Sequence, residues 1–332
     1  MAAEFRNTCD HGDYDTPAAT VASMASETYN CQGKQRCIEN GTDTGPDCAW
    51  ERRLCVTCRR ANSVTKIRVQ TNNLPDHCMS SISVKPQNFD FEVNFNTVAT
   101  YDAWENDFTT QYQLNNGVCP IQTDFDINRL QIVEYGSEES AHAAGFAVNG
   151  VAFQFANQLR EDPVYPQTED NEQPLDTCLG HNQLSSDSGM YHYHHLSPCI
   201  NATFGSVDSA GLHECDETPA CTADKTGYAL SGYASMTTRA IVGLAKDGHV
   251  MYGPYNDTGA LWEPAVVDAC GGSWSSDKTE YFYVGQRWHP YLVGCQGPAN
   301  YPQNAASPLY ATCSTNGMVS KLSHFVGVSL IF

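Results

Sequence analysis

The chain has 332 residues, of which 41% are hydrophobic and 17% charged, so it holds enough apolar material for a buried core. A fibre or a disordered tail is excluded. Lys and Arg total 18 against 38 Asp and Glu, a net charge of -20. Such a surface repels phosphate backbones, which excludes nucleic acids as partners and favours cations.

Cysteine usage and glycosylation sequons indicate an oxidising compartment. The chain carries 15 cysteines and N-x-[ST] sequons at Asn40, Asn201 and Asn256. Thiols at this density are typical of disulfide-bonded, secreted or cell-surface proteins. We therefore expect secretion or display at the cell surface, with N-glycans at the three sequons.

The C-terminus is the candidate segment for membrane attachment. No segment approaches the roughly 20 apolar residues of a transmembrane helix. The longest apolar segment, residues 325–332, follows small and polar residues in the order of a GPI-attachment signal. We treat residues 314–332 as a C-terminal tail that is either a remnant of such a signal or a terminal β-strand.

Residues 1–63 are predicted to form a small disulfide-bonded module. Six of the cysteines fall here, among Gly, Asp, Asn and Thr, with little hydrophobic periodicity. Cys55 and Cys58 form a CxxC pair, but no second pair accompanies it, so structural disulfides are favoured over a zinc site. Such a module is suited to binding an extracellular protein partner.

The fold class is predicted to be mainly β. Apolar residues alternate with polar ones over residues 65–70 and 89–95, which is the pattern of half-buried strands. We read residues 64–313 as one β domain. The whole chain is then a disulfide-stabilised, mainly β protein with two pseudo-symmetric β units and a Cys-rich N-terminal module.

The two β units are predicted from an internal repeat. Residues 145–199 and 243–295 carry the same landmarks in the same order, between 90 and 98 residues apart. Each copy opens on Asn-Gly or Asp-Gly, which predicts a type I′ β-hairpin at residues 149–150 and 247–248. The other landmarks are a Cys pair and a Tyr-x-Tyr strand.

Two equivalent disulfides are expected within the repeats. They join Cys178 to Cys199 and Cys270 to Cys295, while Cys215 and Cys221 lie between the copies and are close enough to pair locally. Asp176 and Asp268 precede the first Cys of each pair by two residues. They either accept a hydrogen bond from a histidine ring or cap the following turn.

The residues that could carry chemistry lie in Tyr191-His192-Tyr193-His194. Side chains alternate faces along a strand, so both imidazoles share one face, with Cα atoms about 7 Å apart, and both phenols the other. His195 follows directly. The expected disulfide would bring His181 close, which predicts a histidine site for copper or zinc.

Histidines packed in a polar core are the alternative. Each imidazole could simply be satisfied by hydrogen bonds there. In the metal interpretation, Tyr191, Tyr193 and Asp176 would hold the metal-binding rings in place by hydrogen bonds.

These residues resemble the signature of the YHYH family of secreted proteins. The resemblance rests on the YHYH sequence, on Cys178-Leu179-Gly180-His181 before it and on Pro198-Cys199 after it, with similar elements at residues 73–77, 148–151, 245–255 and 289–295. It covers roughly residues 64 to 300 and leaves the N-terminus uncovered. It implies an extracellular domain with a metal role, and no established reaction.

The second copy departs from this pattern. Phe282 and Val284 replace the two histidines, so we expect one metal site per chain. His77, in the Pro-Asp-His element, is a further candidate ligand.

Three functions remain open at this point. The first is an extracellular protein that binds divalent copper or zinc. The second is a metalloenzyme with an open three-histidine site, resembling a zinc hydrolase or hydratase, or a copper oxidase in which Tyr191 or Tyr193 participates. The third is a structural or adhesive module without metal.

Overall fold

A computed structural model describes the chain over a series of ranges. These are residues 1–9, 17–30, 38–39, 42–43, 49–61, 64–79, 84–95, 133–134, 143–155, 164–165, 174–182, 189–201, 213–268, 270–276 and 280–294. The sequon Asn40, the half-cystine Cys295 and the C-terminal tail of residues 314–332 lie outside the described residues.

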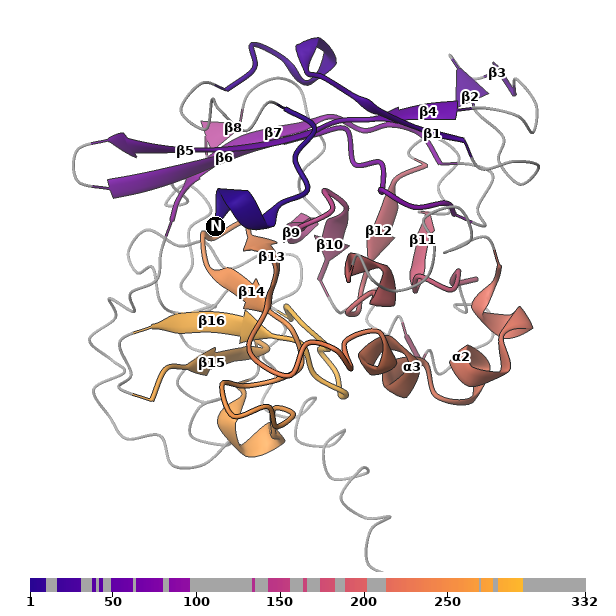
Figure 1. The fold of residues 1–332 in the computed structure, drawn as a ribbon, viewed down its shortest axis with the longest axis vertical. Helices are drawn as coiled ribbons and strands as arrows, with labels where there is room; N and C mark the ends of the chain where they lie inside the picture. Colours follow the sequence, from indigo (N-terminus) through magenta and orange to yellow (C-terminus); the bar gives the residue numbers. More distant parts are fainter. Residues whose placement is uncertain are drawn as a thin grey trace, which may run out of the picture.

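A four-stranded antiparallel sheet forms the upper layer in Figure 1. Its order is β5 (Leu54–Ala61), β6 (Val64–Thr71), β7 (Phe89–Asn94) and β8 (Val133–Glu134). The strands expected at residues 65–70 and 89–95 are β6 and β7. Arg68 of β6 forms a bidentate ion pair with Asp90 of β7, and both hydrogen bonds are 2.7 Å long. Charge pairing therefore supports the polar face of this sheet.

The N-terminal residues add short elements to this layer. They are η1 (Ala2–Glu4), η2 (Val21–Ser23), the pair β1 (Glu27–Asn30) with β4 (Ala49–Arg52), and the pair β2 (Ile38–Glu39) with β3 (Thr42–Asp43). A disulfide joins Cys9 to Cys55. The boundary expected after residue 63 lies in the connection between β5 and β6, which pair along their whole length.

An eight-stranded sheet forms the second layer. Its order is β11 (Gly180–Asn182), β12 (Tyr191–Tyr193), β10 (Ala152–Gln154), β9 (Ala143–Ala147), β13 (Ile241–Ala245), β14 (Val250–Tyr252), β16 (Tyr281–Val284) and β15 (Gly272–Trp274). The order of parallel and antiparallel pairs is the same on both sides of the central strands of this sheet. On each side an antiparallel hairpin is followed by a parallel and then an antiparallel pair.

The centre of this sheet is the antiparallel pair β9 and β13, which we call the seam. Glycines lie on both strands of the seam. A Cβ atom on Gly145 would lie 2.5 Å from the carbonyl oxygen of Leu244, and one on Gly243 would lie 2.4 Å from that of Phe146. Only glycine allows the two backbones to approach this closely.

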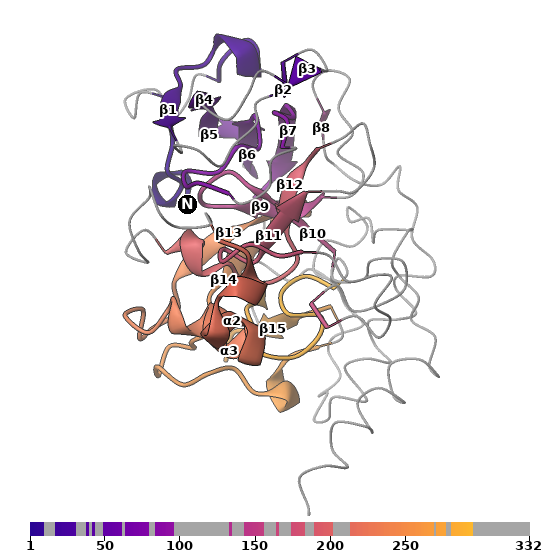
Figure 2. The ribbon, with the colours of Figure 1, turned by 90° about the vertical axis from the view of Figure 1, so that its right-hand side faces the viewer.

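Aromatic packing joins the two sheets. Phe146 on β9 lies 5.0 Å from Phe89 and 5.4 Å from Phe91 between ring centroids. All three side chains are buried within one apolar cluster that draws on both sheets. In Figures 1 and 2 the four-stranded sheet lies above β9.

Both predicted hairpins are present, but neither has the predicted type I′ turn. Gly150 N–H donates to Ala147 O and Gly248 N–H to Ala245 O, which closes both turns. The glycines have φ of 90° and 89°, whereas neither Asn149 nor Asp247 has a positive φ. A type I′ turn needs positive φ at both central residues, so these are longer loops that end on a left-handed glycine.

The remaining helices are short. They are η6 (Pro198–Ile200), η7 (Cys215–Glu217), α2 (Pro219–Ala223), α3 (Lys225–Ser231) and η8 (Pro264–Val266). None of the helices in the described part of the chain has the length and apolar character needed to cross a bilayer.

The two described sequons differ in their surroundings. The side chain of Asn201 is buried, and its Nδ2 donates to Gly232 O at 2.6 Å. Asn256 lies in a turn nearer the surface, where its Oδ1 accepts from Thr258 and Ala260. The nitrogen that would carry a glycan is therefore buried and hydrogen-bonded at Asn201.

Disulfides close two loops around the first half of the sheet. Cys178 pairs with Cys199 and Cys215 with Cys221, as expected from the sequence. Cys270 is also disulfide-bonded, while Cys295, the partner expected for it, lies outside the described residues.

Replacing Cys178 and Cys199 together with alanine should lower the free energy of unfolding by about 3 kcal/mol, because the bond closes a loop of 21 residues in the unfolded chain. Urea denaturation measures this. The matched control removes Cys215 and Cys221, which are six residues apart, and should cost about 2 kcal/mol. A smaller loss for the first pair than for the second would contradict the expectation.

Candidate metal centre

Three histidines meet on one face of the β11 and β12 pair. His181 on β11 lies directly opposite His192 on β12 in the antiparallel register. Residues directly opposite one another share a face, and so do residues two apart along an extended strand. His194 follows two residues after His192, so all three imidazoles lie on the same side.

The turn before β11 sets this register. Asp176 Oδ1 accepts hydrogen bonds from the backbone N–H of Cys178 at 2.9 Å and of Gly180 at 3.0 Å. Its Oδ2 accepts from the hydroxyl of Tyr191 on the neighbouring strand, at 2.7 Å. Gly180 is needed at this point because a Cβ atom there would lie 2.2 Å from the Tyr191 hydroxyl oxygen.

The three imidazole rings are close enough to share one ion. Centroids lie 4.3 Å apart for His181 and His192, 5.2 Å for His181 and His194, and 4.8 Å for His192 and His194. Each ring offers one nitrogen, and these nitrogens all lie within 4.8 Å of one another. All three side chains are buried. They form what we call the histidine cluster.

Backbone carbonyls orient two of the rings. His192 Nδ1 lies 3.0 Å from Met190 O, and His194 Nδ1 lies 3.1 Å from Phe155 O. A carbonyl oxygen only accepts hydrogen bonds, so in a neutral ring with this contact Nδ1 carries the proton. The lone pair then sits on Nε2, which is the arrangement that outer partners give to metal-binding histidines.

The two Nε2 atoms face each other at 3.1 Å. With both protons on Nδ1, two lone pairs would meet there, and a cation between them would relieve the repulsion. Zinc bonds imidazole nitrogen at about 2.0–2.1 Å, which separates two ligands by about 2.9 Å at a right angle and about 3.3 Å at the tetrahedral angle. The observed spacing lies between these values.

His181 completes the cluster without any outer support. Both of its ring nitrogens are buried, and neither has a hydrogen-bond partner among the described residues. Buried polar atoms in proteins are almost always hydrogen-bonded, so an orphan ring of this kind calls for an explanation. A bound ion would supply the missing partner.

Burial keeps the cluster uncharged. Desolvation lowers the pKa of His181 well below 6.5, and the neighbouring His192 and His194 lower it further. The pKa of His194 is lowered in the same way, by burial first and by His192 second. Metal ions bind the neutral imidazole, so these rings are ready to coordinate without losing a proton.

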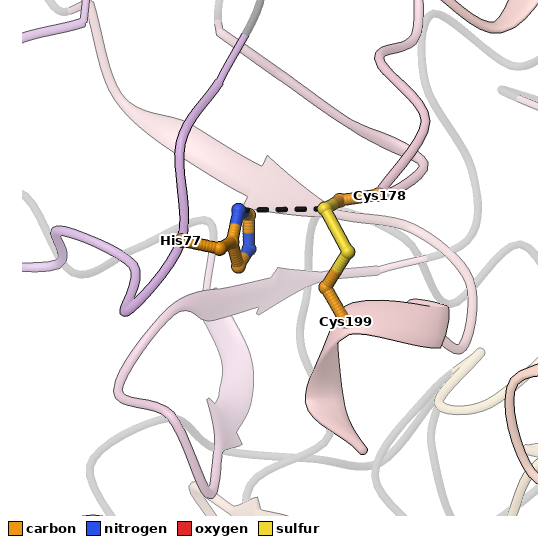
Figure 3. A group of neighbouring side chains, drawn as sticks. All are labelled: His77, Cys178 and Cys199. Atoms are coloured by element: carbon orange, nitrogen blue, oxygen red, sulfur yellow. Dashed lines mark hydrogen bonds between the residues drawn. A yellow bond between two sulfur atoms is a disulfide. The ribbon is translucent and has the colours of Figure 1, made fainter. Parts of the chain in front are cut away.

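His77 does not join the cluster. Its Nε2 lies 2.7 Å from the Tyr193 hydroxyl and its Nδ1 2.8 Å from Cys78 O. Figure 3 shows the ring beside the disulfide of Cys178 and Cys199. Its Nδ1 lies 3.4 Å from Cys178 Sγ. The two sulfurs are bonded to each other and offer no thiolate, so these three residues do not form a metal site in this state.

The remaining predicted site residues also lie apart from the cluster. His195 places Nδ1 3.0 Å from Leu196 O and packs its ring against Tyr291. Tyr191 and Tyr193 lie on the opposite face from the histidines. Asp176 bonds the turn and Tyr191, which is the turn-capping alternative.

The second half repeats this framework without the histidines. Asp268 accepts from Cys270 N–H, Gly272 N–H and the Tyr281 hydroxyl, as Asp176 does in the first half. Ser273 faces Phe282 in the register where His181 faces His192. The corresponding face is apolar, since Phe282 is buried in a cluster with two valines and partly buried aromatic residues.

Sequence reasoning missed the outer partners of the cluster. Met190 and Phe155 contribute only backbone carbonyls, for which side-chain identity gives no signal. Asn73 was also missed: its Oδ1 accepts from Ala152 N–H and its Nδ2 donates to Tyr191 O, each at 2.7 Å. It thereby ties β10 to β12 beside the cluster.

The fold and the cluster together define a disulfide-bonded β protein with a buried three-histidine centre. A family model described as YHYH protein matches residues 128–311. This is more than half of the chain, which therefore belongs to the YHYH family. The match begins after residues 73–77, so that element lies outside it. Neither the curated proteins nor the solved structures include a match.

The buried aspartates predict an unusual pH dependence of stability. Burial raises the pKa of Asp176 from 3.8 to about 8 and that of Asp268 to about 6, against the opposing effect of their hydrogen bonds. The folded chain then holds protons that the unfolded chain has released. The buried histidines act in the opposite sense below about pH 6.5, because the unfolded chain then binds protons that His77, His181 and His194 do not bind in the folded chain. The free energy of unfolding should therefore fall as the pH rises from about 7 to 8, through Asp176, and level off above 8.

The two aspartates can be separated by mutation in the metal-free protein. Asp176→Asn should remove the fall between about pH 7 and 8, whereas Asp268→Asn should leave that part unchanged. Urea denaturation at each pH measures both. An Asp176→Asn protein with the parent's slope between about pH 7 and 8 would show that this carboxyl is ionised when folded.

The histidines themselves should resist protonation. In the metal-free protein at pH 6, we expect His181 and His194 to remain neutral because burial lowers their pKa. Imidazole nitrogen shifts in NMR report the state of each ring, and His194 should carry its proton on Nδ1. Titration of both rings near 6.5 would contradict this account.

Proposed function

We propose that the chain binds one copper or zinc ion through His181, His192 and His194. The observation that carries the proposal is the 3.1 Å approach of His192 Nε2 and His194 Nε2, with both Nδ1 atoms against carbonyls. The orphan nitrogens of His181 support it. Imidazole suits copper and zinc alike, so the donor set is compatible with either ion.

A catalytic role is the second candidate. Structural zinc sites use four protein ligands, whereas catalytic sites keep three and leave a position for water or substrate. The cluster supplies three imidazoles, which is the observation that favours this alternative. A metal-free structural or adhesive module is the third candidate. Metal uptake by the parent protein would exclude it, and a parent that takes up no metal would favour it.

The disulfides support an extracellular compartment. Three cystines among the described residues favour folding in an oxidising environment, so we place the protein in the secretome or at the cell surface. GPI attachment at the tail, a glycan at Asn40 or Asn256 and a protein partner for the N-terminal region are parts of the same proposal.

We further infer that the halves of the eight-stranded sheet are copies of one ancestral unit. The matched strand pairings and the matched hydrogen bonds of Asp176 and Asp268 support this. In this interpretation the second copy lost its ligands and serves as a scaffold.

The second half supplies the substitutions for a test. His181→Ser, His192→Phe and His194→Val place in the first half the residues that the second half has at the corresponding positions. Because the same framework accepts them there, we expect the triple variant to fold. Its uptake of Cu(II) or Zn(II), measured by elemental analysis of untagged protein after dialysis, should fall from one ion per chain to none.

The control is His213→Ala, which removes an exposed histidine. It should bind metal like the parent. Circular dichroism and the melting temperature confirm that the triple variant is folded. Equal metal uptake by the folded triple variant and the parent, or no uptake by the parent, would refute the proposal.

A further inference from the structure

Gln154 lies on the same face of the sheet as the histidine cluster. β10 runs parallel to β12, with Ala152 beside His192 and Phe153 beside Tyr193. The next residue, Gln154, falls beside His194 and on the face of Ala152, because side chains alternate. The register irregularity between Phe153 and Gln154 skips a residue on β9 and none on β10.

The second half gives an independent check on this placement. Tyr252 holds the position of Gln154 at the end of β14, and it pairs with Val284, the counterpart of His194. Its ring packs 5.2 Å from Phe282, the counterpart of His192. The side chain at this position therefore covers the face where the first half has its imidazoles.

The amide of Gln154 is available for a ligand. Its Nε2 is buried and makes no hydrogen bond within the described part of the chain. A buried N–H donor without an acceptor is costly. The group therefore needs an acceptor that the described residues do not provide.

Charge balance at the proposed centre requires the same kind of ligand. Among the described residues, the group of potential ligand atoms here contains imidazoles only. Three neutral imidazoles leave both charges of a divalent ion uncompensated in a buried site, which is unfavourable. A small anion at a fourth position would offset them.

We propose that this fourth position takes a small anionic ligand with an oxygen donor, such as hydroxide or a carboxylate, and that Gln154 donates a hydrogen bond to it from Nε2. The inference rests on the proposed function, since it requires the ion. It makes the centre one that binds an exogenous ligand and Gln154 a positioning residue for that ligand.

The test uses the full-length chain loaded with Cu(II) and titrated with azide, a small anion whose binding to copper produces a charge-transfer absorption. Gln154→Leu should weaken azide binding about tenfold, the effect of losing one hydrogen bond to a charged group. Gln154→Glu, which keeps the size but loses the donor, should weaken it at least as much. Both should take up copper like the parent.

The matched control is Gln286→Leu. Gln286 is also a buried glutamine whose amide atoms have no partner among the described residues, but it follows β16 in the second half. This variant should bind copper and azide like the parent.

The outcomes separate the two proposals. A parent that takes up no copper refutes the proposed function. A parent that binds copper but no azide, or a Gln154→Leu protein that binds azide with parental affinity, overturns the role of Gln154 alone. Loss of copper itself in the folded Gln154→Leu protein also overturns it, because the side chain would then be a ligand rather than a donor.

Discussion

The register of β11 against β12 determines whether a metal centre can exist in this fold. His181 meets His192 because the two strands pair in one alignment. A slip of one residue would turn His181 to the face of the tyrosines. Asp176 fixes the alignment by holding both the turn and Tyr191, and the disulfide of Cys178 and Cys199 closes the loop behind it. A polar framework on one face therefore positions the imidazoles on the other.

Much of this arrangement could be predicted from the sequence. The alternation in Tyr191-His192-Tyr193-His194 placed two imidazoles together, and the Cys spacing brought a third ring near them. The local sequence pattern does not predict contacts that are made by backbone atoms or that depend on how distant strands pair. The carbonyls of Met190 and Phe155 leave no trace in residue type, and nothing in the sequence pairs β10 in parallel with β12. That pairing is what brings Gln154 to the cluster.

The same limit explains His77 and the hairpins. His77 has a suitable side chain, but it packs on the tyrosine face of the sheet. Its position in the sequence does not indicate on which face it lies. The dipeptides at residues 149–150 and 247–248 correctly indicated hairpins. Their turn type depends on the backbone angles of Asn149 and Asp247, which the surrounding loop decides rather than the dipeptide.

The glycine seam between β9 and β13 makes the two halves of the eight-stranded sheet depend on each other. Gly145 and Gly243 let the backbones pair so closely that each half covers an edge of the other. Neither half can be discarded, since the survivor would present an open strand to solvent and to other chains. The half without the histidine cluster is therefore still constrained in its backbone and interior. Substitutions on the face that corresponds to the histidine cluster leave the seam intact, so that face can change while the pairing with the other half is kept.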